Sequence, residues 1–431
     1  MSNKKLHIIY VVEDGITTLC CGVGTIAHHF VCAFHEIAEK SLIHGIKLRL
    51  SIITLAASSS SVGVRADLRE QAQVTCTAFQ GKLYLIEPVV NSNFEYFDFS
   101  VWEKYNEQAN DIIVNISKNT EDAILVIAND TIFAKTRYVN SNVVNVWIPH
   151  SLSSVHAQSY VDNIKRLGWE SQEVQTIQKS PNCYIGYISQ FAKLEIERTF
   201  SLGEGCLVPC LNGFYFPNIQ KYEKSQIEIE SMLKQRGIPT DREIIFSFGR
   251  ADEYKGLDIA LRVMILAAEK YDYQGVLIAS IFSQEAVVSS VQEQLKNLSK
   301  KHNSDVLLFF SYEFELPKYI LQYMKTKFLL NLSIRDFAPL IPYEAELLGH
   351  SDLCIINSDI ECFRSTMSNG QNGFLCPPID IEALSAIENV RLMTKNSKQD
   401  IIYHCKKTAL VEKNIVNNYC QLIFLLIDQY P

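Results

Sequence analysis

The segment IIFSFGRADEYKGL at residues 244–257 predicts a buried strand, a short polar loop and the start of a helix. The strand is a short apolar run, as in strands covered on both faces, and apolar residues recur at helical spacing from Ile259 to Ala267. Arg250 and Lys255 would then stand at a strand's C-terminal end, beside a helix N-terminus. Ligands of open α/β sheets bind at that edge, where helix N–H groups favour an anion. A diphosphate fits best, although two surface cations that share a loop would give the same pattern.

The length and composition indicate a multidomain globular protein. The chain has 431 residues, of which 47% are hydrophobic, and its formal net charge is −8 with both signs interspersed. That balance argues against a general binder of nucleic acid or of anionic membranes, but it does not exclude one local basic pocket. No apolar run reaches the roughly 18 residues of a membrane span. Twelve cysteines without a signal peptide indicate reduced, mostly buried thiols in a cytoplasmic protein.

Strands and helices alternate along nearly the whole chain, which predicts an α/β fold with parallel, doubly wound sheets. We expect strands in the first half at 6–12, 47–55, 83–87, 123–127, 143–148 and 183–189, with helices at 24–40 and 102–117. In the second half we expect strands at 244–248, 275–279, 306–310, 328–332 and 353–357.

The same alternation predicts two domains of similar size. We expect a first Rossmann-like domain at 1–218, a polar linker at 219–241, a second Rossmann-like domain at 242–405, and a C-terminal helix at 406–431 that packs back on the first domain. Two such domains facing each other would leave an interdomain cleft lined by strand ends, where two substrates could meet.

Two glycines open the first helix and form the first candidate site. Gly22 and Gly24 would let the backbone approach a ligand closely. A dinucleotide fingerprint prefers a third glycine where this chain has Ala27, a replacement that the relaxed pattern tolerates. No acid ends the second strand, however, so we favour a loop that contacts an acceptor or a phosphate over a nicotinamide or flavin site.

His150 follows the apolar strand at 143–148 and is the second candidate. An imidazole at the C-terminal tip of a strand can act as a donor, an acceptor or an acid–base group. The alternative is a partly buried histidine whose hydrogen bonds are satisfied by its own loop.

Two acids form the third candidate. Asp336 follows a predicted strand, and Glu344 falls in the first turn of a helix, where the dipole favours a carboxylate that can accept both hydroxyls of a ribose. The intervening loop offers the backbone N–H groups of Phe337, Ala338 and Leu340. Ordinary helix capping is the alternative. The sequence has no Asp-x-Asp pair to clamp a metal–nucleotide complex, no P-loop and no Gly-x-Ser-x-Gly elbow, and we expect no metal site.

Three segments together resemble the retaining glycosyltransferase family 4, namely GRADEYKG at 249–256, DFAPLIPYEAELLG at 336–349 and NGQNGFLCP at 369–377. The resemblance implies the GT-B architecture of two facing Rossmann-like domains. It also implies a nucleotide-sugar donor, with a UDP-sugar expected, and a saccharide or small-molecule hydroxyl acceptor. Neither a nucleic-acid partner nor a cofactor is expected, and contact with a membrane surface is unsupported.

The resemblance also implies roles for single residues. Arg250 and Lys255 would bind the donor diphosphate in place of a metal, Glu344 would hold the ribose, and Asp336 and His150 would contact the transferred sugar. Substitution would occur on the front face with retention of configuration, so that no protein nucleophile is required.

The chain departs from the family pattern in three places, one of which is Tyr215, where the family has an aspartate. Glu361 and Cys362 stand where the family has two glycines, and Ser365 stands where it has an acid. Asp336 replaces a glutamate that is one methylene longer. The departures at Glu361, Cys362 and Ser365 leave open a catalytically degenerate GT-B protein that binds a nucleotide, a glycan or a partner. A sugar-nucleotide epimerase of GT-B fold is a further alternative.

Overall fold

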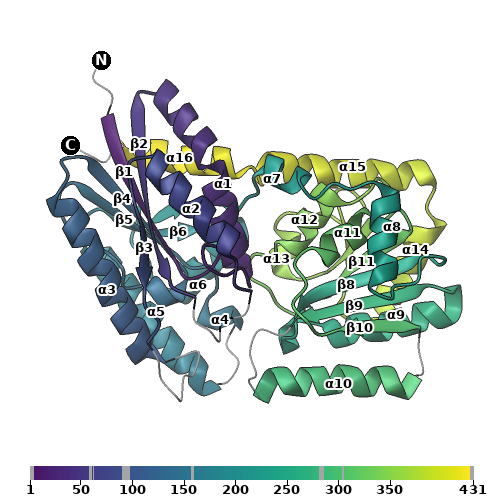
Figure 1. Cartoon of the computed structure of the whole chain (residues 1–431). Helices are drawn as coiled ribbons and strands as arrows, with labels where there is room; N and C mark the ends of the chain where they lie inside the picture. The colour runs from purple at the N-terminus through teal and green to yellow at the C-terminus, as the bar shows by residue number, and fades with distance from the viewer. Residues whose placement is uncertain are drawn as a thin grey trace. The chain divides into compact units, whose positions relative to one another are not determined.

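The computed structural model describes residues 4–57, 61, 63–89, 98–156, 160–280, 286–302 and 305–427. The chain divides into two compact units (Figure 1). Unit 1 comprises Met1–Tyr215 and Asn414–Pro431, and unit 2 comprises Phe216–Lys413. The chain therefore passes between the units twice. In unit 1 the two passages lie side by side, because Phe214 and Asn414 pair as a parallel bridge.

Unit 1 is built on a seven-stranded parallel sheet with the strand order β3-β2-β1-β4-β5-β6-β7. The strands are β1 (Lys4–Val12), β2 (Ile46–Leu55), β3 (Leu83–Ile86), β4 (Ala123–Asn129), β5 (Val143–Ile148), β6 (Cys183–Tyr187) and β7 (Leu207–Pro209). The order reverses between β1 and β4, so the loops after these strands diverge to opposite faces and leave room for a site at their C-terminal ends.

Aromatic contacts fix the helices of unit 1 on its sheet. The α-helices are α1 (Gly22–Ile43), α2 (Ala66–Ala78), α3 (Phe99–Lys118), α4 (Ser153–His156), α5 (Tyr160–Lys179), α6 (Gln190–Thr199) and α16 (Ile415–Ile427), with a 3-10 turn, η1, at Thr131–Phe133. Phe30 of α1 stacks on Tyr10 of β1 at 4.2 Å and contacts Tyr419 of α16 at 4.5 Å between ring centroids. Trp102 and Trp169, 5.7 Å apart, join α3 to α5 (Figure 1).

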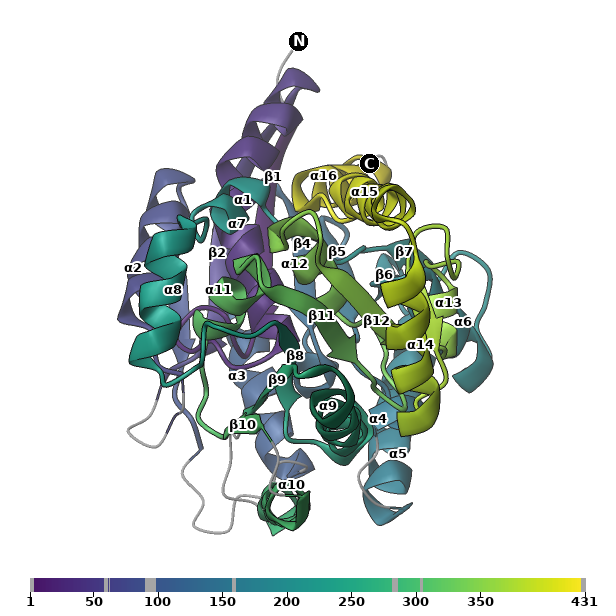
Figure 2. The same ribbon diagram turned by 90° about the vertical axis from the view of Figure 1, so that its right-hand side faces the viewer.

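Unit 2 is built on a six-stranded parallel sheet with the strand order β10-β9-β8-β11-β12-β13 (Figure 2). The strands are β8 (Ile244–Arg250), β9 (Gln274–Ser280), β10 (Val306–Phe309), β11 (Thr326–Asn331), β12 (Cys354–Ser358) and β13 (Phe374–Cys376). The helices are α7 (Phe216–Gln220), α8 (Gln226–Gln235), α9 (Leu257–Tyr271), α10 (Ala286–His302), α11 (Leu316–Gln322), α12 (Ile341–Leu348), α13 (Glu361–Arg364), α14 (Asp380–Leu392) and α15 (Lys395–Glu412), with a 3-10 turn, η2, at Glu253–Lys255.

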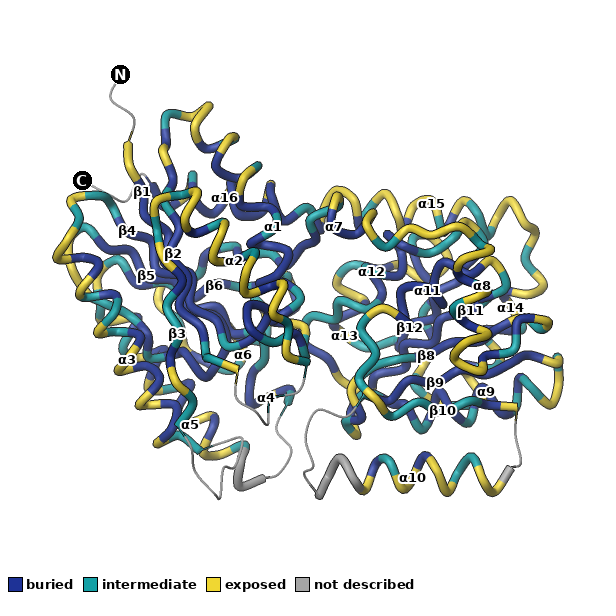
Figure 3. The backbone as a smooth tube through the Cα atoms, in the orientation of Figure 1, coloured by how far each residue is buried: buried dark blue, intermediate teal, exposed yellow. Residues whose placement is uncertain are grey.

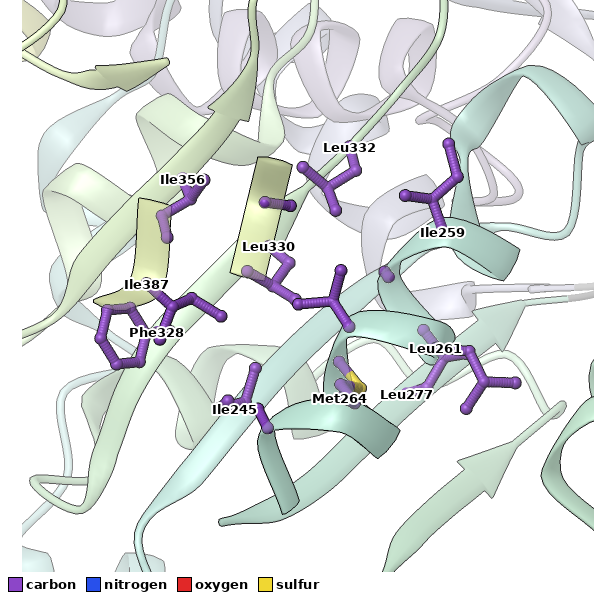
Figure 4. Close-up of a cluster of buried hydrophobic side chains, with 14 of the residues drawn as sticks. Ile245, Ile259, Leu261, Met264, Leu277, Phe328, Leu330, Leu332, Ile356 and Ile387 are labelled. Carbon is purple, nitrogen blue, oxygen red and sulfur yellow. The ribbon is translucent and has the colours of Figure 1, made fainter. Parts of the chain in front are cut away.

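Two hydrophobic clusters cover the two faces of this sheet. Ile245 faces the cluster that contains α9 and α14, and its neighbour Ile244 faces the cluster that contains α8, α11 and α12. Figure 4 shows Ile245, Met264 and Leu277 together in the first cluster. The strands are accordingly buried along most of their length, as Figure 3 shows. This is the doubly wound arrangement that the alternating sequence pattern predicts, and it confirms the α/β class.

The unit boundaries differ from the sequence expectation. Segment 219–241, expected as a linker, belongs to unit 2, because Ile229 and Leu233 of α8 are fully buried in its core. The C-terminal segment 406–431, expected as one helix, is shared between the end of α15 in unit 2 and all of α16 in unit 1, with the break near Lys413. The apolar face of α16, which includes the fully buried Ile423, packs on unit 1.

The cysteines and the helix lengths agree with the composition. All twelve cysteines are free thiols, and most are buried. Burial raises the pKa of the Cys76 thiol to about 12, which keeps it protonated. None of the helices in the described ranges combines the length and apolarity needed to cross a membrane.

Candidate functional site

A glycine brings the loop after β8 against the end of β11. Gly256 has a φ of +60°, and a Cβ placed on it would lie 2.0 Å from the carbonyl oxygen of Leu332. Only glycine fits both the left-handed conformation and this close approach. Just before it, the carbonyl of Tyr254 accepts a hydrogen bond from the amide of Ile334 at 2.9 Å. The loops that carry Lys255 and the predicted acid are therefore held side by side.

Lys255 and Asp336 form an ion pair across these two loops. Their Nζ and Oδ2 atoms are 2.6 Å apart, and the side chains are only 17% and 7% exposed. Burial alone would lower the pKa of Lys255, but the carboxylate of Asp336 and the neighbouring Tyr254 together oppose this effect, and the pKa is raised. Both predicted site residues thus meet, and the ammonium is charged at neutral pH.

Arg250 ends β8 and lies at the centre of a cationic cluster. Its guanidinium is 2.9 Å from Asp252 and donates to the hydroxyl of Tyr254, yet the side chain remains 43% exposed. The Tyr254 ring lies 5.4 Å from Lys255 Nζ and 5.7 Å from the Arg335 guanidinium. Three cations thus surround one buried tyrosine. Sequence reasoning missed Tyr254 and Arg335, although both lie within one residue of a predicted site residue.

The loop before α12 offers fewer backbone donors than the sequence suggests. The amide of Phe337 donates to Asp336 Oδ1 at 2.8 Å, so it orients that carboxylate and is not left for a ligand. The amides of Ala338 and Leu340 have no hydrogen-bond partner among the residues that the structure describes. These two can serve the anion-binding role that we predicted for all three.

Glu344 lies in the first turn of α12, as predicted, but it has a partner that the sequence did not indicate. Its Oε1 atom is 3.3 Å from Nζ of Lys318, a lysine of α11 that is itself almost fully buried. Glu344 Oε2 has no partner among the described residues. The carboxylate therefore has one oxygen paired with a cation and one that can accept hydroxyl groups.

The segment that departs from the family pattern forms the short helix α13. Cys362 is buried, and its pKa is raised by burial and further by the carboxylate of Asp336. Glu361 is the first residue of α13 and Ser365 is its C-cap, and Arg364 is paired with Asp359, which precedes the helix. The departure therefore places a glutamate at 361 and a neutral, protonated thiol at 362, where the family has two glycines.

The glycine loop of unit 1 surrounds an internal carboxylate. Asp14 Oδ2 accepts hydrogen bonds from the amides of Cys20 and Cys21 at 2.8 and 2.9 Å, beside the N-terminus of α1. A Cβ on Gly24 would lie 2.2 Å from that oxygen, so packing against Asp14 accounts for this glycine. Gly22, the first residue of α1, is exposed. A carboxylate at this place disfavours a phosphate, which narrows our expectation for the loop to an acceptor contact.

His150 lies just past β5 and hydrogen-bonds to the end of β4. Its Nε2 atom is 3.1 Å from Asn129 Oδ1, while the Asn129 amide nitrogen donates to the carbonyl of Val11. Asn129 therefore presents its oxygen, which assigns the proton to Nε2. Burial lowers the pKa of His150 to about 4, although Asp130 opposes this. The ring is neutral near pH 7, so of the roles that we considered, the donor belongs to Nε2, which is used by Asn129, and Nδ1 is left as an acceptor.

A buried ion pair supports the loop after His150, and sequence reasoning missed it. Arg166 and Glu170 of α5 are 4% and 0% exposed and pair at 2.8 Å. Arg166 donates to the Ser151 hydroxyl at 2.6 Å, and the Ser153 hydroxyl donates to Glu170 at 2.7 Å. An i, i+4 pair on a polar helix gives no sequence signal of burial, which explains the omission.

The arrangement in unit 2 can bind a polyanion and stabilise negative charge on it. Three cations and two amides lie at the C-terminal edge of the sheet, around Arg250, Lys255 and the loop before α12. Burial raises the pKa of the Cys362 thiol in α13, so the thiol is protonated and is a poor nucleophile. In the described part of the chain, no group of three or more His, Cys, Asp or Glu side chains is arranged to hold a metal ion.

The sequence of unit 2 matches a known family. Residues 228–407 match the family described as glycosyl transferases group 1. This range includes Arg250, Lys255, Asp336 and Glu344. No protein of curated function matches the chain in sequence.

Solved structures match over nearly the whole chain. Sucrose-phosphate synthase from Thermosynechococcus elongatus has a TM-score of 0.69 at 14% identity, with 99% of each chain covered. A glycosyltransferase from Rickettsia africae has a TM-score of 0.64 at 14% identity, and the match covers 99% of this chain and 98% of that one. Anabaena HepE, solved with UDP and glucose, has a TM-score of 0.65 at 15% identity, and the match covers 98% of this chain and 99% of that one. These likenesses show the GT-B fold of two Rossmann-like domains and confirm the resemblance at that level. Membership of family 4 stays a prediction.

Proposed function

We propose that this chain, in which residues 228–407 match the glycosyl transferases group 1, is a retaining glycosyltransferase. It would move a sugar from a nucleotide-sugar donor to a hydroxyl group of an acceptor. The observation that carries the proposal is the set of groups at one edge of the unit 2 sheet. Arg250 and Lys255 lie there beside Asp336, and Glu344 lies in the first turn of α12 with one unpaired oxygen.

The cations would bind the donor diphosphate and stabilise its charge as it leaves. An arginine suits two parallel contacts with phosphate oxygens, and a lysine adds a point charge. Lys255 is paired with Asp336 before the donor arrives. A diphosphate would compete for the ammonium, and the Asp336 carboxylate would then be available to accept hydroxyls of the transferred sugar.

The reaction needs no nucleophile from the protein. The bond between the anomeric carbon and the diphosphate oxygen breaks as the acceptor oxygen forms its bond on the same face. The acceptor's proton passes to the departing phosphate. The neutral His150 would accept a hydrogen bond from a sugar hydroxyl through Nδ1. Glu344 Oε2 would accept the ribose hydroxyls, which anchors the donor.

We further propose a UDP-sugar donor, because Anabaena HepE was solved with UDP and glucose. The acceptor would be a saccharide or another small hydroxyl compound, and the internal carboxylate of Asp14 argues against a phosphate in the glycine loop. Because Arg250 and Lys255 can neutralise a diphosphate, a divalent ion would not be required. Undiminished turnover in the presence of EDTA would support that part of the proposal.

A thermal-shift panel of UDP-, GDP- and dTDP-sugars tests the donor. A ligand that binds the native state raises its melting temperature, and we expect one base to do so. Incubation of the purified protein with the donor then distinguishes a transferase from the two alternatives, a degenerate binding protein, which the departures at Glu361, Cys362 and Ser365 keep open, and an epimerase. The measurement is the slow hydrolysis of the donor. A transferase releases the nucleoside diphosphate, a degenerate binding protein consumes nothing, and an epimerase returns an altered sugar nucleotide.

A further inference from the structure

Lys318 is a buried cation beside the proposed ribose-binding residue. The lysine is 6% exposed, and its ammonium lies 3.3 Å from Glu344 Oε1. The ammonium also donates to the carbonyl of Phe314 at 2.8 Å. The rings of Phe314 and Tyr222 approach it at 3.6 and 4.9 Å from their centroids. Its position is thus defined from several sides.

The surroundings of this lysine are themselves fixed. Gln322, one turn further along α11, donates to the carbonyl of Tyr222 at 2.9 Å and accepts from the amide of Lys224 at 3.1 Å. These bonds tie the segment before α8 to α11, which holds the Tyr222 ring beside Lys318. The ammonium therefore cannot move far from Glu344 without losing the contacts with both rings.

A glutamate side chain that is free to move loses conformational entropy when it binds a ligand, because it must settle into one rotamer. The ion pair with Lys318 restricts Glu344 before any ligand arrives. It also commits Oε1, so that Oε2 is the atom left to accept hydroxyl groups. The Glu344 side chain is only 15% exposed. The ammonium of Lys318 compensates the charge of this carboxylate while the carboxylate accepts two hydroxyl groups.

We propose that Lys318 is a positioning residue for the donor ribose, acting through Glu344. The inference rests on the proposed function, because it assumes that Glu344 binds the ribose of a nucleotide. A purely structural role, in which the pair only fastens α11 to α12, predicts a loss of stability without any change in ribose recognition. The two roles therefore differ in what they predict for ligands with and without ribose hydroxyls.

The test compares the affinities of UDP and 2′,3′-dideoxy-UDP by calorimetry. For the wild type we expect UDP to bind about 30-fold more tightly, as hydrogen bonds to a charged acceptor allow. In K318M and in E344Q the ratio should fall to about 3-fold, while dideoxy-UDP binds each variant as it binds the wild type. The double variant should show no further loss, and K318R should recover most of the ratio.

K327M is the matched control, because Lys327 pairs with Glu243 at 3.8 Å at the opposite end of β11. It should leave the ratio unchanged. If K318M keeps the wild-type ratio while E344Q loses it, the positioning role is overturned and the proposed function stands. If the wild type binds neither nucleotide, or both equally, the assignment of Glu344 and the donor fails, and the role of Lys318 fails with it. Equal weakening of both ligands in K318M would assign the pair a structural role only.

Discussion

Lys255 and Asp336 are 81 positions apart in the sequence, yet their charged atoms are 2.6 Å apart in the structure. The pair joins the loop after β8 to the loop after β11, at the edge where the donor is proposed to bind. In the protein without a donor, each side chain is therefore the other's counter-ion. The binding of a diphosphate would replace one anion by another around the same lysine.

The first prediction concerns this pair. K255M leaves Asp336 buried without its lysine, so we expect a loss of about 3 kcal/mol in the free energy of unfolding. The double variant K255M/D336N should be more stable than the sum of the single variants predicts, by about 1 to 3 kcal/mol. Chemical denaturation of the four proteins measures this coupling. Strict additivity would show that the pair does not form in solution.

The second prediction concerns Arg250. R250A should reduce turnover by at least about 100-fold, because a group that stabilises the leaving charge is removed. The fold should persist, since the side chain is 43% exposed. R236A is the control, because Arg236 is also an exposed partner in an ion pair, with Glu313 at 2.6 Å. Near-normal turnover of R250A would refute the assignment.

The third prediction separates two reasons for the glycine at 256, its positive φ and its close approach to the Leu332 carbonyl. G256A would place a Cβ 2.0 Å from the Leu332 carbonyl oxygen, and its φ is +60°. Positive φ alone costs an alanine about 1 kcal/mol, so the clash should raise the total loss to about 3 kcal/mol or more. Gly237 has a φ of +72° with open space around it, so G237A measures the conformational cost alone. Similar melting temperatures for the two variants would rule out the close approach.

The fourth prediction is a pH dependence set by His150. Burial lowers its pKa from 6.5 to about 4. Between these values the unfolded chain binds the proton more readily than the folded one, so the stability that this residue contributes is lost as the pH falls from 6.5 to 4. Between pH 7 and pH 4, the free energy of unfolding of H150Q should therefore fall by up to about 3 kcal/mol less than that of the wild type. Parallel stability curves for the two proteins would show that the imidazole is solvated.

The sequence was sufficient for the class of the fold and for most of its strands. The apolar runs at 143–148 and 244–248 lie in β5 and β8, as predicted. Each run was recognisable because a strand that is buried on both faces is apolar at successive positions. β7 and β13 have three residues each, too few to show a pattern. The linker interpretation of 219–241 followed its charges, but α8 buries only a narrow apolar face, with Ile229 and Leu233. Charge on the exposed side of a helix says little about what its other side contacts.

The site was predictable where single loops carry it, and less so where partners come from distant segments. The positions of Arg250 and Glu344 at the ends of their elements follow from local patterns. The partner of Glu344 does not, because Lys318 lies in a neighbouring helix and reads as an ordinary charged residue. The packing role of Gly24 was unpredictable for a related reason, since this glycine makes room for Asp14, a contact that sequence spacing does not reveal.

The central claim, transfer from a nucleotide sugar with retention, is tested most directly by NMR of the purified protein with UDP-, GDP- and dTDP-sugars. We predict that the wild type consumes one of these donors and releases its nucleoside diphosphate, while R250A does not. We also predict that the first-formed sugar has the anomeric configuration of the donor. A donor that binds and is never consumed, or a product of inverted configuration, would contradict the account.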